Sequence, residues 1–143
     1  MIRCSRCGAL NRVKVTPEGQ QPICGRCKEA LDVSGAPQDV DGEAVWSAVR
    51  SADLPVLVDV WAPWCGPCRA VAPTVDALSR EFKSGLMSLK VNSDQHPAFS
   101  QQVGVQGIPT FLLFRGGVEV ARQSGAMPRP MFEQWLRQNG VKA

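Results

Sequence analysis

The chain has 143 residues, of which 44% are hydrophobic and 20% are charged, and its formal net charge is +3. This composition excludes an intrinsically disordered chain, and so small a charge does not indicate a dedicated nucleic-acid-binding protein. No stretch approaches the roughly 20 apolar residues of a membrane-spanning helix, and no apolar secretory leader follows Met1. We therefore expect a cytoplasmic protein without a membrane partner.

A short turn-rich stretch at residues 34–38 divides the chain into two parts of different composition. We predict a cysteine-rich domain at residues 1–34 and a larger domain at residues 38–143. The first part has few large apolar side chains, and a unit of that size usually needs a metal, disulfides or a partner to fold. The second part is long enough for one compact core.

Four of the six cysteines lie in the first part, as two C-x-x-C pairs separated by sixteen residues. This spacing is typical of zinc sites, in which two turns each direct two thiolates at one ion. The predicted metal ligands are Cys4, Cys7, Cys24 and Cys27.

Two other interpretations of this segment stay open. A second redox pair is one, although neither C-x-x-C begins an apparent helix after a buried strand. A basic zinc ribbon that contacts nucleic acid is the other, although no aromatic side chains interleave with its arginines to stack on bases.

Helical and extended patterns alternate along the second part of the chain. We predict helices at residues 41–52, from Cys65 toward Gly85, at 97–104 and from Pro130 to Gly140. Strands are predicted at residues 55–61, 86–91, 111–114 and 118–121, the last two as a hairpin. In the last helix we expect Met131, Trp135 and Leu136 to point inward. Strands joined by helices imply parallel pairs and the hairpin adds an antiparallel edge, so the fold class is α/β with a mixed sheet.

The third cysteine pair, Cys65 and Cys68, lies between a predicted buried strand and an amphipathic helix. Cys65 would then sit at the helix N-terminus, where unpaired N–H groups and the helix dipole stabilise a thiolate. We expect Cys65 to be exposed and to act as the nucleophile. Cys68, one turn later, would resolve the mixed disulfide.

Asp59 stands out because it lies inside an otherwise apolar strand, Val-Leu-Val-Asp-Val-Trp. Burial of a carboxylate is costly and raises its pKa. Six residues before Cys65, this side chain could lie beneath the cysteine pair and carry the proton of Cys68. The alternative is a strand whose one polar position faces solvent.

The segment Trp61-Ala62-Pro63-Trp64-Cys65-Gly66-Pro67-Cys68 closely resembles the signature of the thioredoxin family. The resemblance covers residues 38 to 140 and continues with Pro73, with Lys90 to Asp94, and with Gly107-Ile108-Pro109-Thr110-Phe111. It implies the thioredoxin fold, a central mixed sheet with helices on both faces. With its cysteine-rich extension, the whole chain resembles the zinc-containing subgroup of bacterial thioredoxins, the thioredoxin 2 type.

The resemblance also implies roles for single residues. Pro109 would be cis and face the disulfide, as a catalytic-site residue beside Cys65, Cys68 and Asp59, and Lys90 would lie buried near the aspartate. The substrate-binding surface would consist of Trp64, Gly66, Pro67, Ile108, Gly125 and Ala126.

The function implied by the resemblance is a thiol–disulfide oxidoreductase that reduces protein disulfides. Gly66 and Pro67 stand between the cysteines, as in reducing members of the family, so we expect a reductant. Its partners would be disulfide-containing proteins and an NADPH-dependent thioredoxin reductase, and its cofactor zinc. Two other functions stay open: an adaptor in which the zinc segment binds a partner, and a sensor in which oxidation releases zinc.

Overall fold

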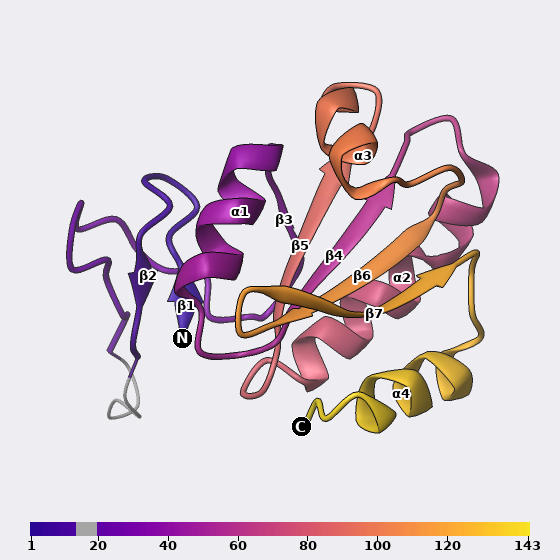
Figure 1. Cartoon of the computed structure of the whole chain (residues 1–143). Helices are drawn as coiled ribbons and strands as arrows, with labels where there is room; N and C mark the ends of the chain where they lie inside the picture. The colour runs from indigo at the N-terminus through magenta and orange to yellow at the C-terminus, as the bar shows by residue number, and fades with distance from the viewer. Residues whose placement is uncertain (14–19) are drawn as a thin grey trace.

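The structure is a computed structural model that describes residues 1–13 and 20–143, and residues 14–19 of the predicted cysteine-rich domain lie outside it. A five-stranded sheet with strand order β3-β5-β4-β6-β7 forms its centre (Figure 1). The strands are β3 (Gln38–Asp39), β4 (Val56–Trp61), β5 (Met87–Asn92), β6 (Thr110–Arg115) and β7 (Val118–Ser124). The helices are α1 (Gly42–Ser51), α2 (Gly66–Glu81), α3 (Pro97–Val103) and α4 (Arg129–Gln138).

The sheet is mixed, as predicted. β4 pairs in parallel with β5, and β5 in parallel with β3. β6 runs antiparallel to both β4 and β7. The central strand β4 is covered on both faces because its residues are apolar at nearly every position.

Two apolar layers hold the helices against the sheet. α1 and α3 cover one face, where Val45, Val49 and Phe99 pack on alternate residues of β4, β5 and β6. α2 and α4 cover the opposite face, where Leu78 and Phe132 pack on the other residues of β4 and β6 (Figure 1). Because side chains alternate along a strand, Asp59 points to the α2 face.

The structure differs from the sequence prediction at two positions of this fold. Met131 was expected inside but is 57% exposed, while its neighbour Phe132 is fully buried. The helical stripe of α4 therefore runs through Phe132 and Leu136 at spacing i, i+4, and Met131 lies beside it. Strand β3, only two residues long, was not predicted, and it takes Gln38 from the stretch expected to be a linker.

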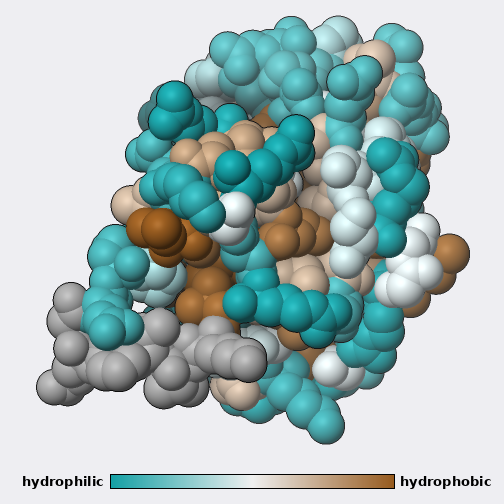
Figure 2. Space-filling model, turned by 90° about the vertical axis from the view of Figure 1, so that its left-hand side faces the viewer, coloured by the Kyte–Doolittle hydropathy of each residue, from teal (hydrophilic) through white to brown (hydrophobic). Residues whose placement is uncertain are grey.

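The N-terminal segment lies beside α1 at one side of the molecule (Figure 1). It contains a small antiparallel pair, β1 (Ile2–Arg3) and β2 (Leu10–Asn11). Figure 2, which looks onto this side, shows hydrophobic residues surrounded by hydrophilic ones. Among the described residues of the segment, the buried side chains are few, namely Cys4, Cys24 and Leu31.

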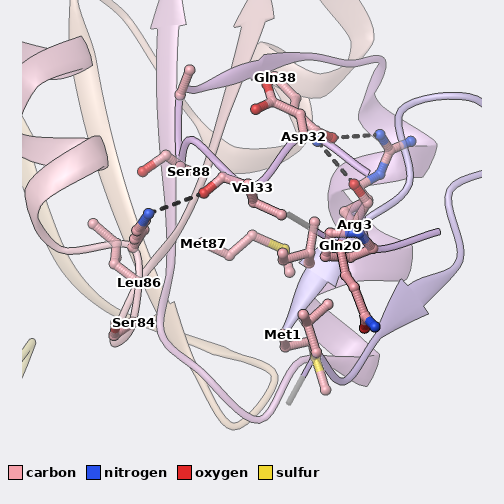
Figure 3. Close-up of a pocket in the computed structure, with 16 residues that line it drawn as sticks. Met1, Arg3, Gln20, Asp32, Val33, Gln38, Ser84, Leu86, Met87 and Ser88 are labelled. Carbon is pink, nitrogen blue, oxygen red and sulfur yellow. Dashed lines mark hydrogen bonds between the residues drawn. The ribbon is translucent and has the colours of Figure 1, made fainter. Parts of the chain in front are cut away.

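Polar contacts attach this segment to the rest of the chain. The Arg3 guanidinium donates to Gln38 Oε1 at 2.9 Å, and Gln38 Nε2 donates to the Arg3 carbonyl at 2.9 Å (Figure 3). Arg12 forms an ion pair with Asp53 at 3.1 Å. A cavity of about 410 Å³ between Met1, Arg3 and the start of β5 remains beside these contacts. It contains no cysteine and lies apart from the site described next.

Candidate active site and metal centre

Cys65 occupies the N-cap of α2, as the sequence predicted. Its extended backbone ends the turn after β4, and its sulfur accepts a hydrogen bond from the Cys68 N–H at 3.2 Å. Pro67, in the first turn, has no N–H to offer. The Cys68 N–H is therefore directed at the Cys65 sulfur, at the end of the helix where a thiolate is stabilised.

The two cysteines of this pair form a disulfide, with their Cα atoms 5.3 Å apart. The prediction that Cys65 is exposed is wrong, since only 5% of its surface is accessible. Ala62, Trp61 and Ile108 pack around the pair and cover it. Sequence spacing could not show this cover because Ile108 comes from a loop more than forty residues away.

The two sulfur-bearing residues border different spaces. Cys65 lines an open groove of about 500 Å³, together with Trp64, Gly66, Pro67 and Ile108. Cys68 instead lines a cavity of about 440 Å³ that also contains Asp59. Exposed residues of α2, namely Arg69, Ala72 and Pro73, also line the second cavity, so each cysteine borders a different opening.

Four of the six predicted substrate-binding residues thus surround the groove. The Ile108–Pro109 peptide bond is cis, and the Ile108 carbonyl oxygen lies 3.8 Å from the Cys65 sulfur. Gly125 is tied to this loop, since its N–H donates to the Pro109 carbonyl at 2.8 Å. Ala126 is exposed next to Gly125 but does not line the groove.

Trp64 is 68% exposed on the groove rim, and its indole N–H donates to Asp94 Oδ2 at 2.9 Å. Sequence reasoning did not assign a role to Asp94. Its position in the turn after β5 was a usable signal, because that strand end lies next to the end of β4.

Asp59 lies on β4, lines the same cavity as Cys68 and is 6% exposed. Its Oδ1 atom is enclosed and has no hydrogen-bond partner among residues 1–13 and 20–143. Burial raises the pKa of Asp59 to about 7, although the Lys90 ammonium opposes this shift. The expectation of a buried carboxylate with a raised pKa is confirmed, and such a group can exchange a proton near neutral pH.

The remaining four cysteines form a second cluster, in which the sulfur atoms all lie within 4.8 Å of one another. The Cys4–Cys27 and Cys7–Cys24 sulfur pairs are each 3.6 Å apart. Four sulfurs at about 2.3 Å from one tetrahedral zinc ion would be about 3.8 Å apart, so the donor set fits this metal.

The backbone builds this cluster from two equivalent turns. In the first, Cys4 N–H donates to the Ala9 carbonyl and Gly8 N–H to the Cys4 carbonyl, both at 2.8 Å. In the second, Cys24 and Lys28 donate to Glu29 and Cys24 in the same pattern. Gly8 and Lys28 occupy matching positions with φ of 79° and 67°.

Asn11 joins the two turns, and sequence reasoning missed it. Its side-chain oxygen accepts from the Gly25 N–H at 2.9 Å, and its amide donates to the Cys24 sulfur at 3.6 Å. A hydrogen bond from the Cys27 backbone N–H is the main cause that lowers the pKa of Cys24 to about 6. A thiolate is the form that binds a metal.

The ionised form of all four thiols requires a cation. A backbone N–H at Glu29 favours the Cys27 thiolate, yet burial and contacts with the other three sulfurs raise the pKa of Cys27 to about 11. Sulfurs this close cannot all carry negative charge without a positive ion between them. The Arg6 side chain, next to Cys7 in the sequence, pairs with Glu29 at 3.0 Å.

Comparison with known proteins assigns the fold. The Thioredoxin family model matches residues 37–138. The chain belongs to the thioredoxin family. Thioredoxin C-3 of Corynebacterium nephridii is 36% identical over 96% of this chain and 94% of its own length, a match that takes in the cysteine-rich segment. Thioredoxin 1 of Chlorobaculum tepidum is 47% identical over 66% of this chain and 90% of its own length.

A solved structure supports the same assignment. The thioredoxin of Malassezia sympodialis (Mala s 13) superimposes with a TM-score of 0.66 at 27% identity, covering 73% of this chain and 91% of its own. The chain is thus a thioredoxin-type thiol–disulfide oxidoreductase with a central mixed sheet flanked by helices. Thioredoxins act on disulfide-containing substrates and are reduced by thioredoxin reductase. No helix in the described residues is long and apolar enough to cross a membrane.

Proposed function

We propose that this thioredoxin reduces protein disulfides through its Cys65–Cys68 dithiol, with Cys65 as the nucleophile and Cys68 as the resolving thiol. The supporting observation is the asymmetry of the pair. Cys65 borders the groove with the exposed Trp64 at the start of α2, whereas Cys68 borders a different cavity, which it shares with Asp59.

The reaction transfers two electrons in two exchanges. The Cys65 thiolate attacks one sulfur of the substrate disulfide, forming a mixed disulfide while the other substrate sulfur leaves as a thiolate. Cys68 then loses its proton and attacks the Cys65 sulfur. The second substrate thiolate leaves, the Cys65–Cys68 disulfide forms, and the substrate is reduced.

Asp59 is the proposed acceptor of the Cys68 proton. Both residues line the same cavity, and the raised pKa of Asp59 places its exchange near neutral pH. The other carboxylate that lines this cavity, Asp76, is about half exposed and is paired with Arg80 at 2.8 Å.

Substrates are proposed to dock on Trp64, Gly66, Pro67, Ile108, Gly125 and Ala126 around cis Pro109. The exposed Trp64 ring and the loop backbone offer an apolar surface that accepts many sequences. The partner that restores the dithiol would be an NADPH-dependent thioredoxin reductase. A reducing compartment such as the cytoplasm suits four free thiols held this close together.

The cysteine-rich segment is proposed to bind one zinc ion through Cys4, Cys7, Cys24 and Cys27. Bound zinc would neutralise the four thiolates and cross-link the two turns. It would stabilise a unit at residues 1–34 that buries few apolar side chains of its own. Residues 38–143 would form the catalytic unit.

The reductase proposal is tested by catalysis of insulin disulfide reduction by dithiothreitol. We expect turnover by the zinc-loaded protein and a loss of at least about 1,000-fold in Cys65→Ser, since the nucleophile is removed. A folded, zinc-loaded wild type without turnover would refute the proposal and favour a binding role.

The zinc proposal is tested by metal analysis of the purified reduced protein. We expect one zinc per chain, and replacement by cobalt should give the absorption bands of a tetrahedral four-thiolate site. A protein that contains no metal, with four titratable thiols in the native state, would refute the site.

A further inference from the structure

We propose that Asp39 is a positioning residue, which holds the Lys90 ammonium away from the Asp59 carboxylate so that Asp59 can keep and pass a proton beneath the redox pair. The inference rests on the proton-carrying role proposed above for Asp59. Sequence reasoning gave Asp39 no role, and it lies on the short strand that was not predicted.

The three charged residues form one row across the sheet. Lys90 on β5 is the register partner of Asp59 on β4 and also of Asp39 on β3. Register partners in neighbouring strands point to the same face, so the three side chains share the α2 face. Neighbouring strands are about 4.8 Å apart, which places the two carboxylates on opposite sides of the lysine.

Lys90 forms its ion pair with Asp39, the outer carboxylate of this row. Its Nζ lies 3.6 Å from Asp39 Oδ2 and 5.0 Å from the centre of the Trp61 ring. In the described part of the chain, the ion pair of Lys90 is with Asp39, and Asp59 has no ion-pair partner. Oδ1 of Asp59 remains without a hydrogen bond.

This placement has a direct electrostatic consequence. Burial is the main cause of the raised pKa of Asp59, Lys90 lowers it, and the negative charge of Asp39 raises it again. An ammonium in contact with Asp59 would favour the carboxylate far more strongly than one held at the outer edge.

The other groups around Asp59 do not replace this effect. From α2, Cys68, Arg69 and Asp76 line the same cavity, and Asp76 is itself paired with Arg80 at 2.8 Å. From β6, the register partner of Asp59 is the uncharged Phe111.

Strand β3 is held from both sides, which fixes the position of Asp39. Val40 N–H donates to the Lys90 carbonyl at 2.9 Å. On the other side, Gln38 exchanges two hydrogen bonds with Arg3 of the N-terminal segment (Figure 3). A two-residue strand would otherwise be weakly held at the sheet edge.

The test follows the titration of Asp59 by the ¹³C NMR signal of its carboxyl carbon in the oxidised, zinc-loaded full chain. The oxidised state is chosen because Cys68 then carries no titrating thiol, so the midpoint belongs to Asp59. We expect Asp39→Asn to lower this midpoint by about half a pH unit, and the shift to shrink in high salt. Asp76→Asn, which removes an equal charge from the same cavity, should leave it nearly unchanged.

A second pair of variants tests whether the effect acts through Lys90. Lys90→Gln should raise the midpoint, and in that background Asp39→Asn should lower it by less than half as much as in the wild type. An unchanged midpoint in folded Asp39→Asn, or an equal shift in Asp76→Asn, would overturn the inference. So would an undiminished shift in the Lys90→Gln background. Because the NMR titration needs no turnover, its result does not depend on the insulin assay that tests the reductase proposal. Failure of one proposal can therefore be distinguished from failure of the other.

Discussion

The redox pair and the four-cysteine cluster share the spacing C-x-x-C and differ in nearly everything else. Cys65 and Cys68 follow a buried strand and begin a sixteen-residue helix, and they form a disulfide. Cys4, Cys7, Cys24 and Cys27 lie in two chain reversals, and their sulfurs gather around one point as free cysteines.

The difference shows that the backbone beyond the motif decides the chemistry. In the redox pair, the helix N-terminus directs the Cys68 N–H at one sulfur, and the other cysteine shares a cavity with a buried carboxylate. In each turn of the cluster, the chain returns on itself through Gly8 or Lys28, so both sulfurs point the same way. Two such turns make a four-sulfur site, and one helix start carries the proposed nucleophile.

Serine substitution of the second cysteine should have the largest effect, and its consequences should differ between the two kinds of pair. In Cys68→Ser the nucleophile remains and the resolver is gone, so turnover should fall by at least about 100-fold and substrates should accumulate as mixed disulfides. Non-reducing gels after incubation with a disulfide substrate measure the adducts. Cys27→Ser should lose zinc and trap nothing. Equal adduct formation by the two variants would contradict the assignment.

Metal removal should separate the two regions next. Chelation from the reduced protein is expected to expose the N-terminal segment, since zinc binding supplies on the order of 10 kcal/mol to small four-ligand units. Limited proteolysis should then cut within residues 1–34 at least ten times faster, while the core of residues 38–143 persists. Unchanged proteolysis of a verified metal-free protein would show that the segment folds without zinc.

Asp59→Asn should increase the free energy of unfolding, and the increase should depend on pH. The pKa of Asp59 is raised by burial from 3.8 to about 7, so the native state favours the protonated form and stability falls as pH rises between these values. Asparagine does not titrate. We therefore expect the variant to be more stable than the wild type by about 2–4 kcal/mol at pH 8. At pH 4.5 the difference should be about 1 kcal/mol or less.

Urea unfolding of the oxidised proteins at both pH values measures this difference. Asp76→Asn serves as the control, because that carboxylate is half exposed and paired with Arg80. A gain in stability that does not depend on pH would mean that Asp59 is not held protonated in the native state.

The smallest expected effect concerns the two matching turn positions of the cluster. Lys28 has a φ of 67°, where an L-residue is strained, and Gly8 has a φ of 79°. Lys28→Gly should therefore cost nothing or stabilise the protein by about 0.5 kcal/mol, whereas Gly8→Ala should cost about 1 kcal/mol. Thermal unfolding with zinc bound compares the variants, and a loss in Lys28→Gly as large as in Gly8→Ala would show that the turns are not equivalent.

Much of this fold was predictable because its signals are local. The apolar run of β4, the helical stripe through Val71 and Leu78, and the position of Cys65 at a helix start all follow from neighbouring residues. The burial of Asp59 was predictable for the same reason, since apolar residues flank it on both sides.

Other features depend on contacts between distant segments and could not be predicted. Strand β3 exists through its pairing with β5 and its bonds to Arg3, and two residues carry no strand pattern of their own. The cover over Cys65 comes from the Ile108 loop. Asn11 acquires its place between the two turns only when these are brought together. Met131 and Phe132 are adjacent in sequence, and only the packing of α4 decides which one is buried.

Brief alkylation of the reduced, zinc-loaded protein, followed by mass spectrometry of each cysteine, tests most directly whether Cys65 and the four-cysteine cluster have different roles. We predict that Cys65 is labelled first, at least about tenfold faster than any other cysteine, because its thiolate is stabilised and borders the groove. Cys4, Cys7, Cys24 and Cys27 should react only after zinc is removed. Equal labelling of all six cysteines with zinc present, or protection of Cys65 alongside the other four, would contradict the division into a nucleophile and a metal site.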